Sequence, residues 1–336
     1  MCLTPRQLCV SDLTPPWAPK NGVLGFCFLL GIPGNILVVI IILRHFKREN
    51  FTLHLMLNLA VSDILCLLTA PLSIYNLLFG WHIGRVLCKT VYFLIYFSGY
   101  ASVLTVTLIS VHRYVFVLYP RQWAKLGRKG ERALLLILWL AASCIFGGLS
   151  VTTFDVIRVG SRELCWRIHL SDGKRVAVLL TEIVLTSIPF SIIVTSYFCL
   201  HKKVNQHALF SNRRLTRLIT SIVVTFLILW IPAHVVTIVD VFAISIKTQN
   251  RVLYDKLLAI KTVSRPVTTS FIFINSCVNP LLYALFFVNT SLIIRHCVKI
   301  PCISTVARLT SQIMSIKYIT LKMVYMKYIT LKIVVL

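Results

Sequence analysis

The chain has 336 residues, of which 57% are hydrophobic and 13% charged, and its mean hydropathy is +0.84. These values are typical of membrane proteins and exclude most classes of soluble fold. The formal net charge is +25, but no nucleic-acid-binding motif accompanies it, so we do not expect a nucleic-acid partner.

Seven apolar segments are long enough to cross a bilayer, which takes roughly 20 residues. They cover 21–43, 53–79, 86–118, 133–154, 176–200, 215–246 and 257–288. The alternative, a set of helices buried in a large soluble core, would require seven such runs in one short chain. The sequence therefore predicts an all-α membrane protein with a seven-helix transmembrane bundle.

The ends of the chain and the connections between spans predict its orientation. We expect an extracellular N-terminus at 1–20, the bundle at 21–290 and a cytoplasmic tail at 291–336. The first twenty residues lack the apolar core of a signal peptide, so the first span is expected to direct insertion. Lysine and arginine gather in the first, third and fifth connections, which places the N-terminus outside and the C-terminus inside, against anionic lipid. Basic residues near 158–175 and 247–265 are on the outer side, where they either steer an anionic ligand or form a solvated surface.

Two of the eleven cysteines, Cys88 and Cys165, fall on the outer face, whereas most of the others lie within spans. The outer compartment is oxidising, which predicts a disulfide that pins the fourth-to-fifth connection to the start of the third span. Cys2 and Cys9 also lie outside, and the sequence leaves their pairing open.

A carboxylate in the middle of the second span, Asp63, is costly in lipid and should face the bundle interior with a partner. Further polar side chains that can face it are Ser102 in the third span and Asn275, Ser276 and Asn279 in the seventh. Such oxygen donors suit a small hard cation such as sodium, with Asp63 and Ser102 as metal ligands. The alternative is a protonated aspartate in a plain hydrogen-bond network.

The inner end of the third span carries His112, Arg113 and Tyr114. An arginine at this depth either extends to the interface or changes partners when the helices shift.

The last three spans each combine a proline with aromatic or polar side chains. The members are Pro189 and Tyr197 in the fifth span, Phe226, Trp230 and Pro232 in the sixth, and Asn279, Pro280 and Tyr283 in the seventh. Phe226 and Trp230 are four residues apart, so they share one helix face below Pro232. This recurrence favours hinges over ordinary core packing. The fourth span has no proline, and we expect Gly147-Gly148 to bend it instead.

Taken together, these motifs resemble those of rhodopsin-like (class A) G-protein-coupled receptors over about residues 21–290. The landmark residues that match are Asn35, Asp63, Arg113, Trp139, Pro189, Pro232 and Pro280. The resemblance implies a plasma-membrane receptor, not an enzyme, with a sodium pocket at Asp63 that collapses on activation. It also implies a switch made of His112, Arg113, Tyr114, Tyr197, Phe226, Trp230, Pro232, Pro280 and Tyr283. The partner implied is a heterotrimeric G protein, of the inhibitory type because the connection at 201–214 is short and basic.

Within that family the chain looks most like the chemoattractant branch, particularly leukotriene B4 receptors. The matching motifs are Tyr100-Ala101-Ser102-Val103-Leu104 and Trp230-Ile231-Pro232-Ala233-His234. The likeness implies an acidic lipid ligand, since a carboxylate pairs with arginine in an otherwise apolar pocket. The ligand-binding residues implied are Tyr92, Tyr100, Arg175, Glu182, His234 and Arg265. Tyr92 stands where that group has a histidine, and a peptide ligand is the alternative.

Two features depart from the family. His112 replaces the usual aspartate beside Arg113, and an imidazole cannot supply a negative charge, so we expect weaker restraint at rest and raised basal activity. The rival interpretation is lost coupling and a non-signalling decoy receptor. The tail repeats 317–322 at 327–332, and it is either a membrane-surface segment or an altered gene terminus.

Other functional classes find no support in the sequence. No paired carboxylates, phosphate loop or clustered histidines indicate an enzyme. A transporter or channel would show inverted repeats, broken half-helices or rings of pore charges, and none is evident.

Overall fold

The computed structural model describes residues 18–45, 50–160, 162–168, 171–204 and 213–288. Most of the expected N-terminal segment, the Cys2 and Cys9 pair, and the tail with its repeat lie outside these residues. The chain forms two compact units, one up to Pro280 and one from Leu281. The packing below is that of the first unit.

The seven predicted spans are helical along most of their length. In chain order the elements are α1 (Ala18–His45), α2 (Phe51–Leu67), α3 (Ala70–Phe79), α4 (Arg85–Leu118), α5 (Pro120–Ala141), a π-helical turn (Ala142–Gly147), α6 (Gly148–Thr153), β1 (Phe154–Val159), β2 (Arg162–Arg167), α7 (Asp172–Val204), α8 (Arg213–Ser245) and α9 (Arg251–Val288). Five stretches of the described residues are long and apolar enough to cross a membrane, namely Asn21–Arg44, Phe51–Phe79, Arg85–Leu118, Asp172–Leu200 and Leu218–Ser245. The fourth predicted span comprises the second, smaller part of α5, the π turn and α6, and the seventh lies within α9.

Two spans are interrupted at places that the sequence explains. The break between α2 and α3 precedes Pro71, which has no N–H to continue the helical ladder. The fourth span changes to a π turn at Ala142–Gly147, close to where the glycine pair predicts a bend. A Cβ atom on Gly147 would lie 2.3 Å from the ring of Phe93 on α4, so a glycine is needed for this close approach.

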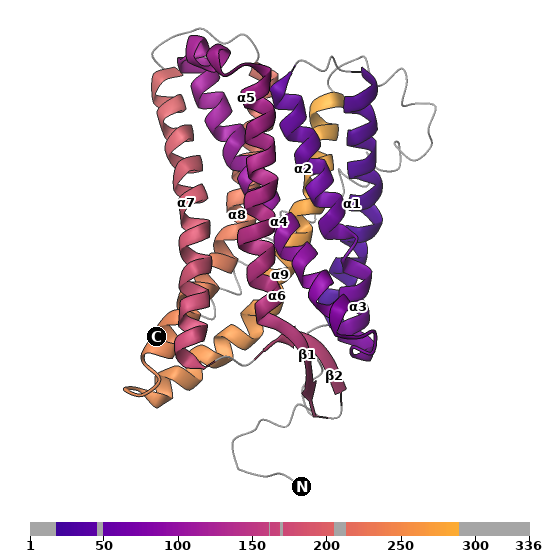
Figure 1. Cartoon of the computed structure of the whole chain (residues 1–336), viewed down its shortest axis with the longest axis vertical. Helices are drawn as coiled ribbons and strands as arrows, with labels where there is room; N and C mark the ends of the chain where they lie inside the picture. Colours follow the sequence, from indigo (N-terminus) through magenta and orange to yellow (C-terminus); the bar gives the residue numbers. More distant parts are fainter. Residues whose placement is uncertain (1–17, 46–49, 161, 169–170, 205–212, 289–336) are drawn as a thin grey trace. The chain divides into compact units, whose positions relative to one another are not determined.

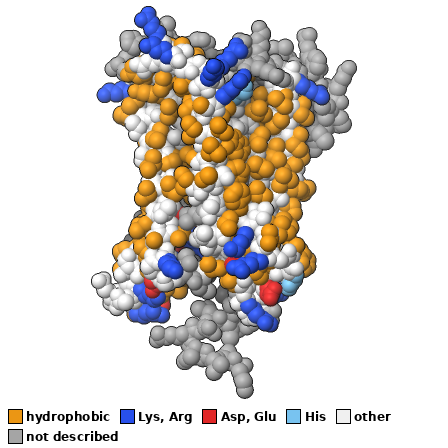
Figure 2. Space-filling view, viewed as in Figure 1, with side chains coloured by type: hydrophobic (Ala, Val, Ile, Leu, Met, Phe, Trp, Pro, Cys, Tyr) orange, Lys and Arg blue, Asp and Glu red, His pale blue; other side chains and the backbone are white. Residues whose placement is uncertain are grey.

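The central helix is α4, which packs against α2, α5, α7 and α8 (Figure 1). Small residues on its buried side, including Gly99, Ala101 and Ser102, allow the neighbouring helices to come close. Hydrophobic side chains cover the middle of the helices, and lysine and arginine gather towards both ends (Figure 2). This distribution is typical of helices that cross lipid and end in water.

Between α6 and α7 the chain forms an antiparallel hairpin in which Val156 on β1 faces Cys165 on β2. Its turn includes Gly160 at φ +62°, a conformation that favours glycine. We use the term hairpin end for the part of the bundle that carries β1, β2 and residues 80–84. The opposite end is the part that carries residues 118–120, where α4 gives way to α5 (Figure 1).

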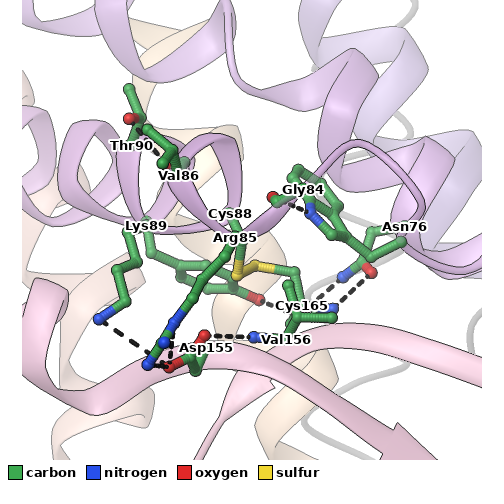
Figure 3. The surroundings of a disulfide bond; sticks show 12 residues. Asn76, Gly84, Arg85, Val86, Cys88, Lys89, Thr90, Asp155, Val156 and Cys165 are labelled. Carbon is green, nitrogen blue, oxygen red and sulfur yellow. Dashed lines mark hydrogen bonds and ion pairs between the residues drawn. A yellow bond between two sulfur atoms is a disulfide. The ribbon is translucent and has the colours of Figure 1, made fainter.

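The hairpin is fastened to the helices beside it (Figure 3). The predicted disulfide between Cys88 on α4 and Cys165 on β2 is confirmed. The side-chain amide of Asn76 binds Cys165 twice, donating to its carbonyl oxygen at 2.9 Å and accepting from its N–H at 3.0 Å. In addition, the Trp81 N–H donates to the Glu163 carbonyl oxygen at 2.7 Å. A covalent bond and backbone hydrogen bonds therefore hold β2 against α3 and α4.

A surface ion pair fastens the other strand. Asp155 on β1 accepts a hydrogen bond from Arg85 Nε at 2.8 Å, and Lys89 Nζ lies 3.9 Å from the same carboxylate oxygen. The hydrogen bond from Arg85 is the main reason why the pKa of the Asp155 carboxyl lies below its usual value. The hairpin therefore has a fixed position over this end of α4.

Candidate functional site

The middle of the bundle holds the fully buried carboxylate of Asp63 on α2. Its Oδ2 accepts a hydrogen bond from Asn279 Nδ2 on α9 at 2.7 Å. Its Oδ1 accepts a long hydrogen bond from Ser102 Oγ on α4 at 3.4 Å. Asn275 and Ser276 are buried on the same helix as Asn279. Three helices thus direct polar side chains to one point, where the sequence predicts a cation site.

These side chains suit a small hard cation such as sodium. In the described part of the chain, no lysine or arginine pairs with Asp63, and a buried carboxylate without a counter-charge is costly. No group of three His, Cys, Asp or Glu side chains able to hold a metal occurs among the described residues. A cation here would therefore be held by Asp63 together with neutral oxygens such as that of Ser102.

Asn35 on α1 satisfies a backbone group that Pro280 leaves free. A proline has no N–H, so the carbonyl of Ser276, four residues earlier, loses its helical partner. Asn35 Nδ2 donates to that carbonyl at 3.0 Å. Close contact is possible because residue 34 is a glycine, whose added Cβ would lie 2.8 Å from the Pro280 ring. The Gly34-Asn35 pair and Pro280 therefore form one structural unit across two helices.

The aromatic pair on α8 is stacked as its spacing predicts. The rings of Phe226 and Trp230 are 5.5 Å apart and inclined by 28°, and both are buried. Tyr100 on α4 lies 6.2 Å from Trp230, whose indole N–H is buried without a hydrogen-bond partner among the described residues. Pro232 follows within the same helix. The stack thus contacts α4 next to a proline that weakens the ladder of α8.

At the opposite end, part of the guanidinium of Arg113 has no acceptor among the described residues. Its Nε and Nη2 are buried and find no hydrogen-bond partner in the described structure. The neighbouring His112 is buried and turned elsewhere, with Nδ1 3.4 Å from Thr52 Oγ1. Its ring packs against Trp123 with centroids 4.5 Å apart. The ring of His112 thus contacts Thr52 and Trp123, and whether the restraint on Arg113 is weaker at rest stays a prediction.

The remaining switch residues lie on several helices. Tyr114 packs edge-on against Tyr119 with centroids 6.0 Å apart. The Tyr197 hydroxyl on α7 donates to Thr220 Oγ1 on α8 at 3.0 Å, which joins these helices near the opposite end. Tyr283 is buried in the second unit of the chain.

The hairpin end contains a cluster of four charged side chains, which we call the Asp240 cluster: Arg175 on α7, Asp240 on α8, and Lys261 and Arg265 on α9. Asp240 Oδ1 accepts hydrogen bonds from Arg175 at 2.6 Å and from Lys261 at 2.9 Å. Its Oδ2 accepts one from Arg265 at 3.2 Å. The carboxylate side chain is 2% exposed, whereas the three basic side chains are 15% to 33% exposed. The two arginines predicted to bind a ligand thus share one acidic partner.

A second ion pair lies between the hairpin and α7. Arg167 on β2 pairs with Glu182, another predicted ligand residue, and its guanidinium sits over the ring of Phe154 at 5.7 Å. Tyr92 stacks on the same ring at 3.7 Å, and its hydroxyl donates to the Cys165 carbonyl at 3.4 Å. Tyr92 on α4 therefore contacts both strands of the hairpin.

His234 faces α7. Its Nδ1 is 2.9 Å from Thr186 Oγ1 and its Nε2 is 3.1 Å from Ser187 Oγ. Its ring lies 6.1 Å from that of Phe190, which also contacts Phe226. His234 thus connects α8 to α7, and Phe190 on α7 in turn contacts Phe226 of the aromatic stack.

The sequence predictions of ligand-binding residues omit three members of these clusters, namely Asp240, Lys261 and Arg167; the two basic ones appear there only among the basic residues of the outer connections. The chain has only ten acidic residues, and an aspartate or glutamate within an apolar span is itself a sign of a buried partner. That sign points to Asp240 as clearly as it does to Asp63. The identity of its partners depends on how the three helices are rotated, which no local pattern specifies.

Comparisons with known proteins agree with this architecture. The model of the 7 transmembrane receptor (rhodopsin family) matches residues 34–283. Human leukotriene B4 receptor 1 is 31% identical over 221 residues, which cover 65% of this chain and 63% of the relative. Mouse chemerin-like receptor 2 is 30% identical over 222 residues, covering 63% and 62%.

Human atypical chemokine receptor 3 is 28% identical over 228 residues, which cover 65% of this chain and 63% of the relative. The aligned part of the chain thus spans less than two thirds of the length of the relatives it matches. The relatives carry different ligands in their names, so the likeness extends to a group of receptors and not to one ligand.

Proposed function

Because the chain belongs to the rhodopsin family of G-protein-coupled receptors, which are multi-pass plasma-membrane proteins and not enzymes, we propose that it is a receptor for an acidic lipid. The lipid would bind at the hairpin end, which we take to be extracellular, and the opposite end would meet a heterotrimeric G protein. A chemoattractant lipid similar to leukotriene B4 is the ligand class that we favour.

The observation that supports this ligand class is the charge of the Asp240 cluster. Three basic side chains face a single carboxylate, which leaves a surplus of two positive charges. They lie at the ends of helices whose middle parts are mainly apolar, as a lipid chain requires. An arginine binds a carboxylate through two parallel hydrogen bonds, so this site suits the acid group of a lipid. The name of the relative leukotriene B4 receptor 1 agrees with this choice.

The path to the opposite end would run along α8. A ligand at Arg265 and His234 would press on the stack of Phe226 and Trp230, next to Pro232. A shift of α8 would then change the contact between Tyr197 and Thr220 and open the surface around Arg113. Such a change is a shift between two pre-existing states, because a ligand only favours the state that it binds better.

Two finer features complete the proposal. A sodium ion held by Asp63 and Ser102 would stabilise the resting state, since that site needs a positive charge. The G protein would be of the inhibitory type, on the grounds of the short basic connection at 201–214.

A second candidate, a decoy receptor that binds its ligand without coupling, is favoured by one observation. Within the described residues no carboxylate pairs with Arg113, and His112 lies against Thr52, which agrees with the loss of the family's usual restraint. One relative is named an atypical chemokine receptor. Ligand binding without nucleotide exchange on the G protein would favour this candidate.

The proposal is tested with leukotriene B4 and a panel of other acidic lipids and chemotactic peptides. Binding to the full chain in lipid nanodiscs is measured alongside nucleotide exchange on an added G protein. We expect Arg265→Ala to weaken the binding of an acidic lipid by about 30-fold or more. Removing one partner of a buried charged pair costs about 2 kcal/mol or more.

Arg162→Ala is the matched control, because Arg162 is an exposed arginine of the hairpin that carries the same charge. This variant should bind the lipid as the native chain does. Equal affinity of the native chain and Arg265→Ala for every acidic lipid that binds would show that the ligand site is elsewhere. Binding of peptides alone would favour the peptide alternative.

A further inference from the structure

The carboxylate of Asp240 has the environment that a bound ligand acid would need. It is buried, it lies among apolar helices, and it accepts hydrogen bonds from two guanidinium groups and one ammonium group. These donors come from two other helices, so one carboxylate on α8 connects α7 to α9. In the exposed pair of Lys247 and Asp172, by contrast, the carboxylate is open to water and accepts from a single ammonium group, and such surface pairs contribute little.

The basic side chains would not gather here without an anion. Three positive charges within hydrogen-bonding distance of one point repel one another strongly where water is scarce. Asp240 offsets this repulsion, but only in part, because a surplus of two positive charges remains. The cations are also more exposed than the carboxylate, so each keeps a side that a second anion can reach.

We propose that Asp240 holds, in the ligand-free receptor, the place of the ligand's acid group, so that the carboxylate of the ligand and that of Asp240 compete for Arg175, Lys261 and Arg265. This inference rests on the proposed function in one respect, that the ligand is an acid. It adds a residue that sets the affinity of the site. It also specifies the group that the ligand must carry: a carboxylate, or an anion of similar size that accepts three hydrogen bonds.

The competition has a mechanical consequence. While Asp240 holds all three cations, the hairpin half of α8 is tied to α7 and α9. When a ligand acid takes over some of these cations, α8 loses that tie. Asp240 lies eight residues beyond Pro232, about two turns further along the same helix. Loss of its ion pairs would therefore free the part of α8 between Pro232 and the hairpin end, which the proline allows to bend relative to the rest of the helix.

The test is chemical rescue of the missing carboxylate. Asp240→Ala leaves a space of about the size of a carboxylate, lined by three cations. The melting temperature of the purified full chain in nanodiscs is measured in chloride, in acetate at the same ionic strength, and with neutral acetamide added. We expect the variant to melt at a lower temperature than the native chain in chloride, and acetate to restore at least half of the loss. Acetamide should restore none of it.

Two further variants make the result specific. Asp172→Ala removes the carboxylate of the exposed Lys247–Asp172 pair at the same end, and acetate should not raise its melting temperature. Adding Lys261→Gln to Asp240→Ala removes one positive charge and should reduce the rescue. If Asp240→Ala does not accumulate, Asp240→Ser, which also frees space, is measured in the same way.

Each outcome decides the proposal. An equal effect of acetate on the native chain, on Asp172→Ala and on the Asp240 variant would overturn it, and so would rescue by acetamide or no rescue at all. The probe is acetate and not a lipid, so the result does not depend on which lipid the receptor binds. Rescue by acetate in a chain that binds no acidic lipid would reject the proposed ligand class and leave the anion site in place.

Discussion

At the scale of single residues, the side chain at position 112 decides whether Arg113 has an acidic neighbour in the sequence. We expect His112→Asp to lower ligand-free nucleotide exchange by about tenfold, because a carboxylate beside Arg113 would accept from nitrogens that have no partner among the described residues. A hydrogen bond to a charged group contributes about 1.5 kcal/mol or more, which corresponds to that factor. The measurement is the rate of nucleotide exchange on a G protein added to the full chain without ligand.

His112→Asn provides the control, since an amide has the shape of the carboxylate without its charge. Its exchange rate should stay closer to that of the native chain. A rate in His112→Asp equal to the native rate would contradict raised basal activity. If the native chain shows no exchange and His112→Asp acquires a response to ligand, the decoy interpretation is correct.

At the scale of elements, α1 and α9 are joined where Pro280 interrupts the hydrogen-bond ladder of α9. We expect Asn35→Ala to destabilise the bundle by about 1–3 kcal/mol, because the Ser276 carbonyl then stays buried without a donor. In Pro280→Ala the alanine N–H returns to that carbonyl, so adding Asn35→Ala should cost clearly less. The native chain, the two single variants and the double variant form a double-mutant cycle, measured by thermal unfolding in nanodiscs. Equal costs in both backgrounds would show that Asn35 does not act through this carbonyl.

Elements differ in how far the sequence predicts them. The helices follow from apolar length, the disulfide from the compartment of two cysteines, and the stack of Phe226 and Trp230 from helical spacing. The partners of Asp240 do not follow, because they depend on the rotation of α7, α8 and α9 about their axes. Asn76 was also missed, since nothing local indicates that its amide will bind the backbone of Cys165.

At the scale of the whole molecule, Asp63 is where α2, α4 and α9 meet, between the hairpin end and the opposite end. We expect sodium chloride to raise the melting temperature of the native chain above its value in choline chloride, since an ion that binds only the folded state stabilises it. Asp63→Asn should abolish the difference. Asp172→Asn, which removes an exposed carboxylate, should keep it. The same sodium effect in Asp63→Asn as in the native chain would place the ion elsewhere.

The attachment of the hairpin has a consequence for redesign. Apart from the side chains of Cys165 and Arg167, which pair with Cys88 and Glu182, β2 is held by its backbone: Asn76 binds the main chain of Cys165, and Trp81 binds the carbonyl of Glu163. The exposed side chains of Arg158, Arg162 and Glu163 take no part in these bonds. Those three positions can therefore be randomised in a library without detaching the hairpin from the bundle. Variants with new ligand preferences can then be selected while the backbone of the hairpin stays in place.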